Sequence, residues 1–398
     1  MELSRKIIGV KPSTTLAIGA KAKELRAAGK DVVAFTVGEP DFDTPENIKE
    51  AGIKAINDGF TKYTAASGIV ELRKAICDKL KNDNNIIYTP EQVVVCNGAK
   101  QALASSFMAI LNDGDEVIIP APFWVSYSAM VEMVGGKPVI VYTKAENNIM
   151  LSKEELEAAY TEKTKAIVLT SPSNPTGMIA SMENLEDIAK FAVEHDIIVI
   201  ADEIYEKLIY NKNKKHISIA SLGKEIYDRT ITINGVSKSY AMTGWRIGYV
   251  ACPLNIAKCI STIQSHMSSN PNSMAQMAVL EALTGPQDSV ESMRLQFEKR
   301  RDYIFEREEE IPLIKALKPE GAFYLFVDIS EVCGKKYKGT EIKDAADFAD
   351  RLLEDKLTAV VPCADFGMKN YIRLSYAISM EEIKKGMDRI AQFIGELE

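Results

Sequence analysis

The sequence has 398 residues, of which 46% are hydrophobic and 26% charged, as is usual for a soluble globular protein. This length allows one large domain and a smaller one, each with its own core. A formal net charge of −8 argues against nucleic acid as a partner, because a nucleic-acid-binding protein favours a basic face.

Other classes of protein are disfavoured by features that the sequence lacks. No apolar run reaches the roughly 18 residues of a membrane span, so no membrane partner is expected. The N-terminal residues lack the apolar core of a signal peptide, so we expect a cytoplasmic protein. The six cysteines are scattered without a CxxC pair, and the three histidines are too few and too far apart to suggest a metal site.

The N-terminal part is predicted to form helices around one short strand. A helix is expected over 16–29, and an apolar strand over 31–37 stops at Gly38. A glycine at a strand end lets a ligand approach the backbone closely, although a tight turn explains it equally well. A further helix is expected from Thr44, with proline in its first turn. The polar loop that follows it carries Tyr63, which by itself would be an ordinary surface aromatic residue.

A buried strand that turns directly into a helix is predicted over 93–103. Gly98 lies at the turn, and the backbone N–H groups of Ala99 and Lys100 begin the helix. The free N–H groups and the positive end of a helix dipole form an anion site. Strand–glycine–helix turns are common in α/β proteins, so the pattern alone is a weak indication of a phosphate site.

Strands and helices then alternate, and the strands are expected at 116–120, 137–142, 166–171, 197–201, 230–234 and 246–251. Nearly continuous apolar strands with helices between them indicate a largely parallel sheet covered on both faces. Ligands bind such sheets beyond the carboxyl ends of the strands. The polar or aromatic candidates that follow those ends are Trp124, Asn174, Asp202, Tyr205 and Lys238. Asp202 could instead cap a helix, and 171–177 could be only a proline-rich turn.

The C-terminal part begins with a long charged helix over 287–310, which is predicted to bridge two domains. A smaller α/β unit follows over 313–398. Arg373 lies in the middle of its predicted strand 371–376, where a charge is costly unless it is paired. A structural salt bridge would satisfy it.

The stretch 231–252 is predicted to form a strand, a loop of small residues that carries Lys238, and a second strand that starts at Arg246. A desolvated lysine can form a Schiff base with an aldehyde. Ser237 and Arg246 offer a hydroxyl donor and a guanidinium fork, which suit a phosphate. Pyridoxal 5′-phosphate (PLP) combines an aldehyde with a phosphate. The spacing alone is equally compatible with a surface lysine.

The longer string Ser-Lys-Ser-Tyr-Ala-Met-Thr-Gly-Trp-Arg-Ile-Gly-Tyr over 237–249 resembles the cofactor-lysine signature of the class I aminotransferases. The resemblance covers nearly the whole chain, and it is strongest to the bacterial Iβ-type aspartate aminotransferases. It implies the type I PLP-dependent transferase fold, an α/β fold whose large domain has a mostly parallel seven-stranded sheet covered by helices. The implied division is an N-terminal segment 1–45, a large PLP-binding domain 46–285, and a linking helix with the small domain 286–398. The small α/β domain is made from both chain ends.

The resemblance also implies roles around the cofactor. Lys238 would hold PLP covalently and shuttle protons, while Asp202 would keep the pyridine nitrogen protonated and Tyr205 would assist at the phenolic oxygen. The other residues implied to bind the cofactor are Asn174, Ser237, Arg246, Gly98, Ala99, Lys100, Trp124 and, from the partner subunit, Tyr63. The chain would therefore form a homodimer with shared active sites.

The implied reaction moves the amino group of L-aspartate to 2-oxoglutarate by a ping-pong mechanism through the pyridoxamine form. The implied substrate-binding residues are Gly38, Trp124, Asn174 and Arg373 for the α-carboxylate region, Lys100 for the distal carboxylate, and Lys11 for prephenate. Small amino acids and 2-oxo acids would be the partners, and no metal is expected. An aspartate/prephenate or aromatic aminotransferase and a β-lyase remain alternatives. A non-catalytic binding protein is disfavoured, because Lys238 and Asp202 are both present.

Overall fold

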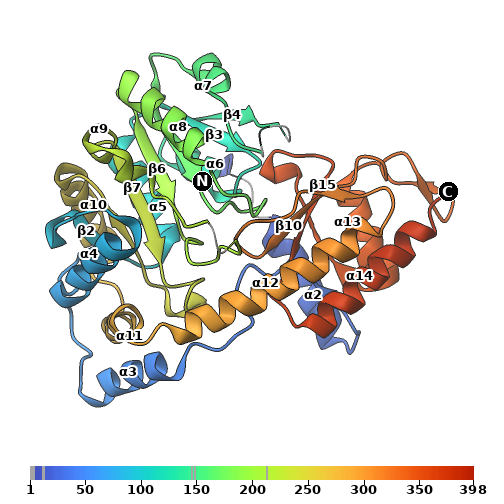
Figure 1. Cartoon of the computed structure of the whole chain (residues 1–398), viewed down its shortest axis with the longest axis horizontal. Helices are drawn as coiled ribbons and strands as arrows, with labels where there is room; N and C mark the ends of the chain where they lie inside the picture. Colours follow the sequence, from blue (N-terminus) through green and yellow to red (C-terminus); the bar gives the residue numbers. More distant parts are fainter. Residues whose placement is uncertain (1–4, 11–13, 145–146, 148, 212–213) are drawn as a thin grey trace.

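The computed structural model describes residues 5–10, 14–144, 147, 149–211 and 214–398. A seven-stranded sheet forms the larger part of the molecule (Figure 1), in the order β2–β8–β7–β6–β5–β3–β4. Its strands are β2 (Val93–Cys96), β3 (Glu116–Ala121), β4 (Lys137–Tyr142), β5 (Thr164–Thr170), β6 (Ile198–Asp202), β7 (Thr230–Gly235) and β8 (Gly248–Ala251). β3 to β7 pair in parallel, whereas β8 is antiparallel to β2 and to β7. The prediction of a mostly parallel seven-stranded sheet is confirmed.

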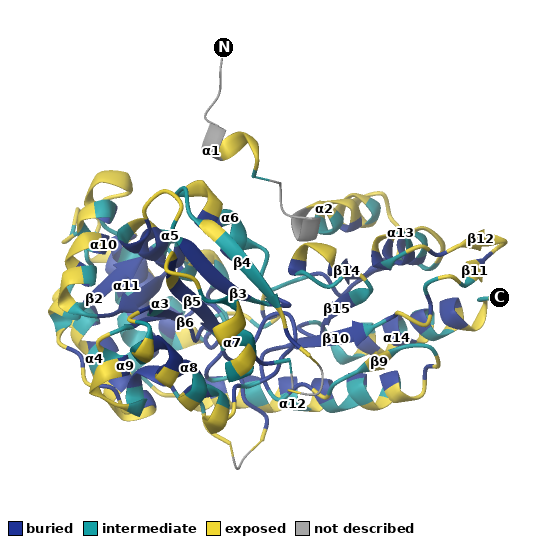
Figure 2. Cartoon of the chain, turned by 90° about the horizontal axis from the view of Figure 1, so that it is seen from above, coloured by how far each residue is buried: buried dark blue, intermediate teal, exposed yellow. Residues whose placement is uncertain are grey.

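Helices cover both faces of this sheet, as its apolar strands require. Neighbouring strand residues pack to opposite sides: Ile200 joins the core under one face and Val199 the core under the other. One face carries α5 (Ala99–Ile110), α6 (Ser126–Met133) and α10 (Leu254–Met267). The opposite face carries α4 (Val70–Asn84), α7 (Lys153–Ala159), α8 (Met182–Glu194), α9 (Lys224–Tyr227) and α11 (Ser273–Thr284). Figure 2 shows the strands buried between helices whose outer sides are exposed.

A second, antiparallel sheet lies in the smaller part of the molecule, in the order β14–β15–β10–β9. Its strands are β9 (Lys315–Ala316), β10 (Tyr324–Asp328), β14 (Val361–Pro362) and β15 (Tyr371–Ser375). The long helix α12 (Asp288–Glu309) runs from the large sheet to this part (Figure 1). α13 (Ala345–Lys356), α14 (Met380–Gly395), β11 (Lys336–Tyr337) and β12 (Thr340–Glu341) complete it.

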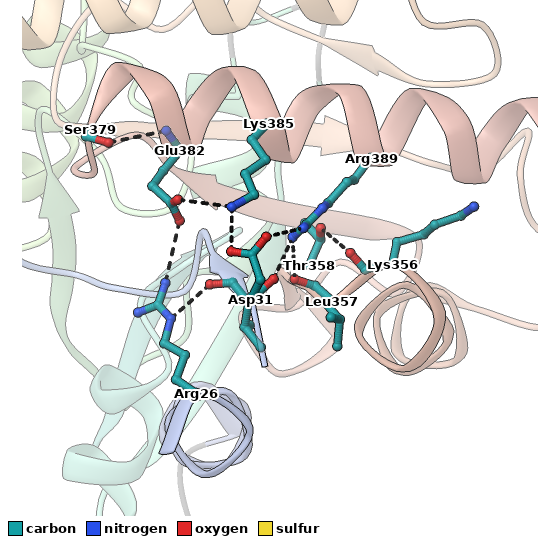
Figure 3. Close-up of polar contacts among 10 residues, drawn as sticks. Arg26, Asp31, Lys356, Leu357, Thr358, Ser379, Glu382, Lys385 and Arg389 are labelled. Carbon is teal, nitrogen blue, oxygen red and sulfur yellow. Dashed lines mark hydrogen bonds and ion pairs between the residues drawn. The ribbon is translucent and has the colours of Figure 1, made fainter. Parts of the chain in front are cut away.

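The N-terminal residues contact this smaller part. β1 (Val33–Ala34) pairs in parallel with β13 (Thr358–Ala359). Asp31 accepts hydrogen bonds from Lys385 and Arg389 of α14, and Arg26 at the end of α2 (Thr14–Ala27) donates to the carbonyl of Val32 (Figure 3). These contacts fix α2 against the C-terminal helix. The exact division at residues 45/46 and 285/286 stays a prediction.

Several element boundaries differ from the predicted ones. β8 begins at Gly248 rather than at Arg246, because Arg246 has φ 55° and ends a short 3₁₀ turn over Thr243–Trp245. In the small α/β unit, α13 begins at Ala345, where the Asp344 side chain caps two backbone N–H groups. The strand expected over 31–37 is reduced to the two residues of β1.

The remaining described helices are α1 (Arg5–Ile8) and α3 (Glu46–Asn57). α1 lies at the periphery in Figure 2 and contacts α6. Among the helices of the described ranges, none has both the length and the apolar character needed to cross a membrane.

Candidate active site

A cavity of ≈ 510 Å³ lies where the carboxyl ends of the parallel strands meet the smaller part of the chain. This volume is that of a typical site for a small ligand. The predicted site residues that line it are Gly38, Ala99, Lys100, Trp124, Asn174, Asp202, Tyr205, Ser237, Lys238, Arg246 and Arg373. Side chains from distant parts of the sequence are thus brought together as the strand order predicts.

Asp202 ends β6 and is only 4% exposed. The Tyr127 hydroxyl donates a hydrogen bond of 2.6 Å to its Oδ2, and the Ile204 N–H donates to its Oδ1 at 3.3 Å. Burial raises the pKa of Asp202 to about 6, although these two hydrogen bonds act in the opposite direction. No helix begins at Asp202, since the following residues form a turn, so the capping interpretation is wrong. A buried carboxylate facing a cavity suits a cationic ligand group.

Lys238 lies in the loop after β7, and its Nζ donates a hydrogen bond of 2.5 Å to the carbonyl oxygen of Gly38. Burial lowers the pKa of Lys238 to about 8. The nearby carboxylate of Glu39 raises that pKa, whereas Arg246 and Arg373 lower it further. A buried lysine beside other cations holds a usable fraction of neutral amine near neutral pH, which is the nucleophilic form.

An anion site is built around the N-terminus of α5. Gly98 precedes the helix with φ 82°, and a Cβ atom on it would lie 2.5 Å from Nη2 of Arg246. A Cβ atom on Gly248 would lie 2.4 Å from the backbone nitrogen of Ala99. These two glycines therefore allow a guanidinium group and the N–H groups of a helix start to meet at one point. Ser237 lines the same cavity and is buried. The combination suits a phosphate.

Arg373 in β15 is only 2% exposed. Its Nη1 donates to Oδ1 of Asn174 at 3.0 Å, its Nη2 donates to the carbonyl of Thr36 at 3.3 Å, and its Nε has no hydrogen-bond partner among the residues that the structure describes. Its Cζ lies 4.4 Å from the centre of the Tyr324 ring. Within the described part of the chain, no carboxylate forms an ion pair with it, so the structural salt-bridge interpretation is not supported. A buried, uncompensated cation at a cavity wall favours a bound anion.

Three phenols complete the inner wall, and the sequence predicted only one of them, Tyr205. Tyr205 shares a hydrogen bond of 2.8 Å with the hydroxyl of Tyr324, and Tyr127 holds Asp202. Burial raises the pKa of Tyr205 and Tyr324, so both phenols stay neutral donors. Neither Tyr127 nor Tyr324 stands in a recognisable motif. Their positions at the cavity become evident only in the folded chain, where each of them lies next to the end of a strand.

Lys100 and Trp124 lie toward the outer part of the cavity. Lys100 is exposed, yet its Nζ lies 4.8 Å from the centre of the Trp124 ring. Partial burial, and then the charge of Arg246, lower the pKa of Lys100. The Lys100 side chain therefore lies over the Trp124 ring, which lines the cavity, instead of extending freely into solvent.

Two predicted residues within the described part of the chain do not line this cavity, although one of them, Gly98, adjoins it through its contact with Arg246. Tyr63 is 90% exposed and does not line it, as expected for a residue assigned to the partner's site. One chain does not test that assignment, which stays a prediction. Lys11 lies outside the described residues.

Comparisons with known proteins agree with this geometry. A family model described as "Aminotransferase class I and II" matches residues 30–390. The chain is 48% identical over 397 residues to an aspartate aminotransferase of Bacillus subtilis (strain 168), with 99% of each chain covered. It is 47% identical to a probable aspartate/prephenate aminotransferase of Rickettsia conorii, with 98% of each covered. The crystal structure of an aspartate aminotransferase from Rhizobium meliloti matches with a TM-score of 0.96 and 40% identity, covering 100% of both chains.

Proposed function

The chain belongs to the class I and II aminotransferases, and from that premise we propose that it transfers the amino group of L-aspartate to 2-oxoglutarate, giving oxaloacetate and L-glutamate. The observation that carries this proposal is the buried guanidinium of Arg373, which faces the same cavity as the partly buried amine of Lys238. A guanidinium fork suits an α-carboxylate, and a neutral amine suits a carbonyl carbon. Donor and acceptor would use this one site in turn, in a ping-pong reaction.

PLP is the cofactor that these residues fit. The carboxyl of Asp202 is buried and has no cationic partner at ion-pair distance among the described residues, so a protonated ring nitrogen would offset the cost of its burial. The glycine-lined junction of Arg246 and α5 fits a phosphate. When bound, PLP supplies an electron sink that stabilises negative charge at the substrate Cα.

We assign each residue one contact with this group. Lys238 would hold the aldehyde carbon covalently, and Asp202 would hold the proton at the ring nitrogen. Tyr205 and Asn174 would bind the phenolic oxygen, and Trp124 would lie against the ring. The phosphate would be held by Ser237, Arg246 and the helix start at Gly98, Ala99 and Lys100. In the reaction, Lys238 Nζ would take the proton from the substrate Cα and return it, as a base with a pKa of about 8 can do.

The substrate would be held at both of its ends. Arg373 would grip the α-carboxylate, assisted by the Asn174 amide, the Trp124 indole N–H and the backbone at Gly38. Lys100 offers a second cation in the same cavity, which a dicarboxylic substrate needs. We also assign to Lys11 the role of an added cation for a bulkier acid such as prephenate.

A substrate panel tests this function. We expect aspartate and glutamate, with their 2-oxo acids, to be turned over with a higher kcat/KM than alanine or tyrosine. The name of the Rickettsia relative makes aspartate/prephenate transamination the second candidate, so prephenate belongs in the panel. A preference for tyrosine or alanine over aspartate would contradict the proposed function.

We further propose that the active unit is a homodimer with shared sites. Apolar side chains exposed on one chain support this proposal: Ile7 and Ile8 on α1 are 50% and 64% exposed, and Ile53 and Ile56 on α3 are each 55% exposed. Tyr63 follows α3 in the chain and is itself 90% exposed. A monomer would leave this apolar surface in water.

Hybrid dimers test the role of Tyr63. We would mix Tyr63→Phe subunits with Lys238→Ala subunits. If Tyr63 acts on the partner's site, the hybrid contains one site with both an intact Lys238 and an intact Tyr63, so normal PLP affinity returns at that site. If Tyr63 acts within its own subunit, every site in the hybrid carries one of the substitutions, and the Lys238-bearing site keeps the weaker affinity of Tyr63→Phe.

A further inference from the structure

A buried cluster of charged side chains lies behind the Asp202–Tyr205 turn and is not part of the cavity. We call Lys79, Glu203, Glu206 and His216 the ion cluster. Their side chains are 7%, 4%, 5% and 7% exposed. Nε2 of His216 lies 3.0 Å from Oε2 of Glu203, and Lys79 forms an ion pair with Glu206. The four residues come from α4, from the turn after β6 and from a loop, so the fold alone unites them.

Neutral residues satisfy much of the cluster's remaining hydrogen bonding. Ser218 Oγ donates to Glu203 Oε1 at 2.6 Å, and Asn84 Nδ2 donates to Glu206 Oε2 at 2.7 Å. Lys79 in turn donates to the Asn84 side-chain oxygen at 2.7 Å. Such pairing of the carboxylates is what the cost of burying charges demands. Both ring nitrogens of His216 lack a hydrogen-bond partner among the described residues, so the imidazole is held by its ion-pair contact with Glu203 alone.

The charge of the ion cluster balances in one protonation state. Glu203 and Glu206 carry two negative charges and Lys79 carries one positive charge, so His216 must be an imidazolium for the sum to be zero. Burial acts to lower the pKa of His216, but the carboxylates of Glu203 and Glu206 outweigh it, and the pKa is raised. Burial likewise acts to raise the pKa of Glu206, but Lys79 and His216 lower it to about 2.

The charged and phenolic groups next to the ion cluster do not alter its net charge of zero. Asp83 and Lys207 pair at 2.8 Å beside the cluster and cancel each other. The phenols of Tyr240 and Tyr249 are kept neutral because burial raises their pKa. A divalent cation is not required either, because Lys79 already supplies the cation on Glu206.

Residues of the same turn contribute to the cavity and to the ion cluster. Asp202 and Tyr205 line the cavity, whereas Glu203 and Glu206 belong to the cluster. The Glu203 N–H also donates to the carbonyl of Ile233 in β7 at 2.9 Å. After burial and its hydrogen bonds, the charge of Glu203 is the next influence on Asp202, and it raises the pKa of that carboxyl.

We propose that the ion cluster is a positioning site for the reaction: an imidazolium at His216 compensates Glu203 and thereby keeps Asp202 ionised and the Asp202–Tyr205 turn fixed. This inference rests on the proposed function in assigning Asp202 to a cationic ring nitrogen. Replacing His216 with a neutral residue leaves one uncompensated negative charge beside Asp202. Removing Glu203's charge as well restores the balance.

The first test measures His216 directly. The chain has three histidines, so ¹⁵N-histidine spectra of the full-length protein are simple to assign with His195→Gln and His266→Gln. We expect an imidazolium signature for His216 at neutral pH, and a lower His216 pKa in Glu203→Gln. A neutral imidazole for His216 at about pH 7 would overturn the proposal. This result does not depend on which reaction the protein catalyses.

The second test measures Asp202 through the affinity of the apoprotein for PLP between about pH 5 and pH 8. We expect His216→Gln to move the acidic midpoint up by about one pH unit, and His216→Gln/Glu203→Gln to return it close to that of the wild type. The matched control is His195→Gln, because His195 also pairs with a carboxylate, Glu157, at 3.1 Å, but far from the cavity. An unmoved midpoint in His216→Gln, or no recovery in the double variant, would overturn the proposal. If the wild type bound PLP but did not transaminate aspartate, only the proposed function would fail.

Discussion

The inner end of the cavity and its mouth hold their charged groups very differently. At the inner end, Asp202 and Arg373 are 4% and 2% exposed. Asp202 accepts a hydrogen bond from Tyr127, and Arg373 donates one to Asn174. At the mouth, Lys100 is exposed and contacts one aromatic ring. Fixed, desolvated charges stabilise a developing charge strongly, whereas a flexible, hydrated charge adds a modest attraction. We therefore expect changes at the inner end to affect the reaction with every substrate, and changes at the mouth to affect the choice of substrate.

The largest effect is expected for Lys238→Ala. The substitution removes the amine that reacts with a carbonyl carbon and moves the Cα proton, so kcat should fall by at least about 10³-fold. The protein should remain folded, because the side chain makes a single hydrogen bond, to Gly38. The assay is steady-state transamination with aspartate and 2-oxoglutarate. Lys224→Ala is the matched control, since Lys224 is an exposed lysine that pairs with Asp228. A wild-type rate in Lys238→Ala would contradict the assignment.

Asp202→Asn should lower kcat by about 10²-fold or more while the holoprotein stays folded, because it removes the charge that holds a proton at the ring nitrogen. The same change should stabilise the apoprotein. The pKa of Asp202 is about 6 in the folded chain and near 3.8 in the unfolded chain, so the folded state loses stability as pH rises from about 4 to 6. Above that range, Asn should add up to about 3 kcal/mol to the free energy of unfolding.

Thermal unfolding of the apoproteins checks this second expectation. Asp202→Asn should unfold at a higher temperature than the wild type at pH 8, and the difference should shrink toward pH 4. Retention of full kcat would favour a purely structural role for Asp202. A lower unfolding temperature at pH 8 would show that its burial carries no net cost.

Arg373→Lys should act on all substrates alike. Lysine keeps the charge but loses the planar fork that binds a carboxylate through two hydrogen bonds. We expect kcat/KM to fall by about 10²-fold for aspartate, alanine and their 2-oxo acids, since all carry the α-carboxylate. Arg294→Lys is the control, because Arg294 pairs with Glu291 and Glu298 along α12, outside the cavity. A loss confined to dicarboxylic substrates would indicate instead that Arg373 binds the distal carboxylate.

The inner end was also the part that the sequence predicted best. Asn174, Asp202 and Lys238 each follow a strand of a parallel sheet, so sheet topology alone places them together. A residue such as Tyr127 is not predictable in this way, because its hydroxyl is aimed by the packing of α6 on the sheet.

The misses have physical reasons. Arg246 was expected in a strand, but its backbone is left-handed at the end of a 3₁₀ turn and its guanidinium contacts Gly98, and no local pattern reveals either feature. The sequence did not predict that Lys79 and His216 lie close together, because more than a hundred residues separate them and only the tertiary fold brings them into one cluster. The role proposed for Tyr63 involves a second chain, so it stays a prediction.

The smallest and most selective effect is expected for Lys100→Met, which keeps an unbranched side chain over the Trp124 ring and leaves the backbone N–H at the helix start. If the ammonium binds the distal carboxylate, its loss should cost on the order of 1.5–3 kcal/mol, which lowers kcat/KM for aspartate and 2-oxoglutarate by roughly 10- to 150-fold. Alanine and phenylalanine lack that carboxylate, so their kcat/KM should be nearly unchanged. The measurement is kcat/KM for these four substrates with the wild type and with Lys100→Met, and it compares the loss for the acidic substrates with the loss for the neutral ones. An equal loss for acidic and neutral substrates would mean that Lys100 contributes only its backbone to the anion site, and the mouth would then not select the substrate.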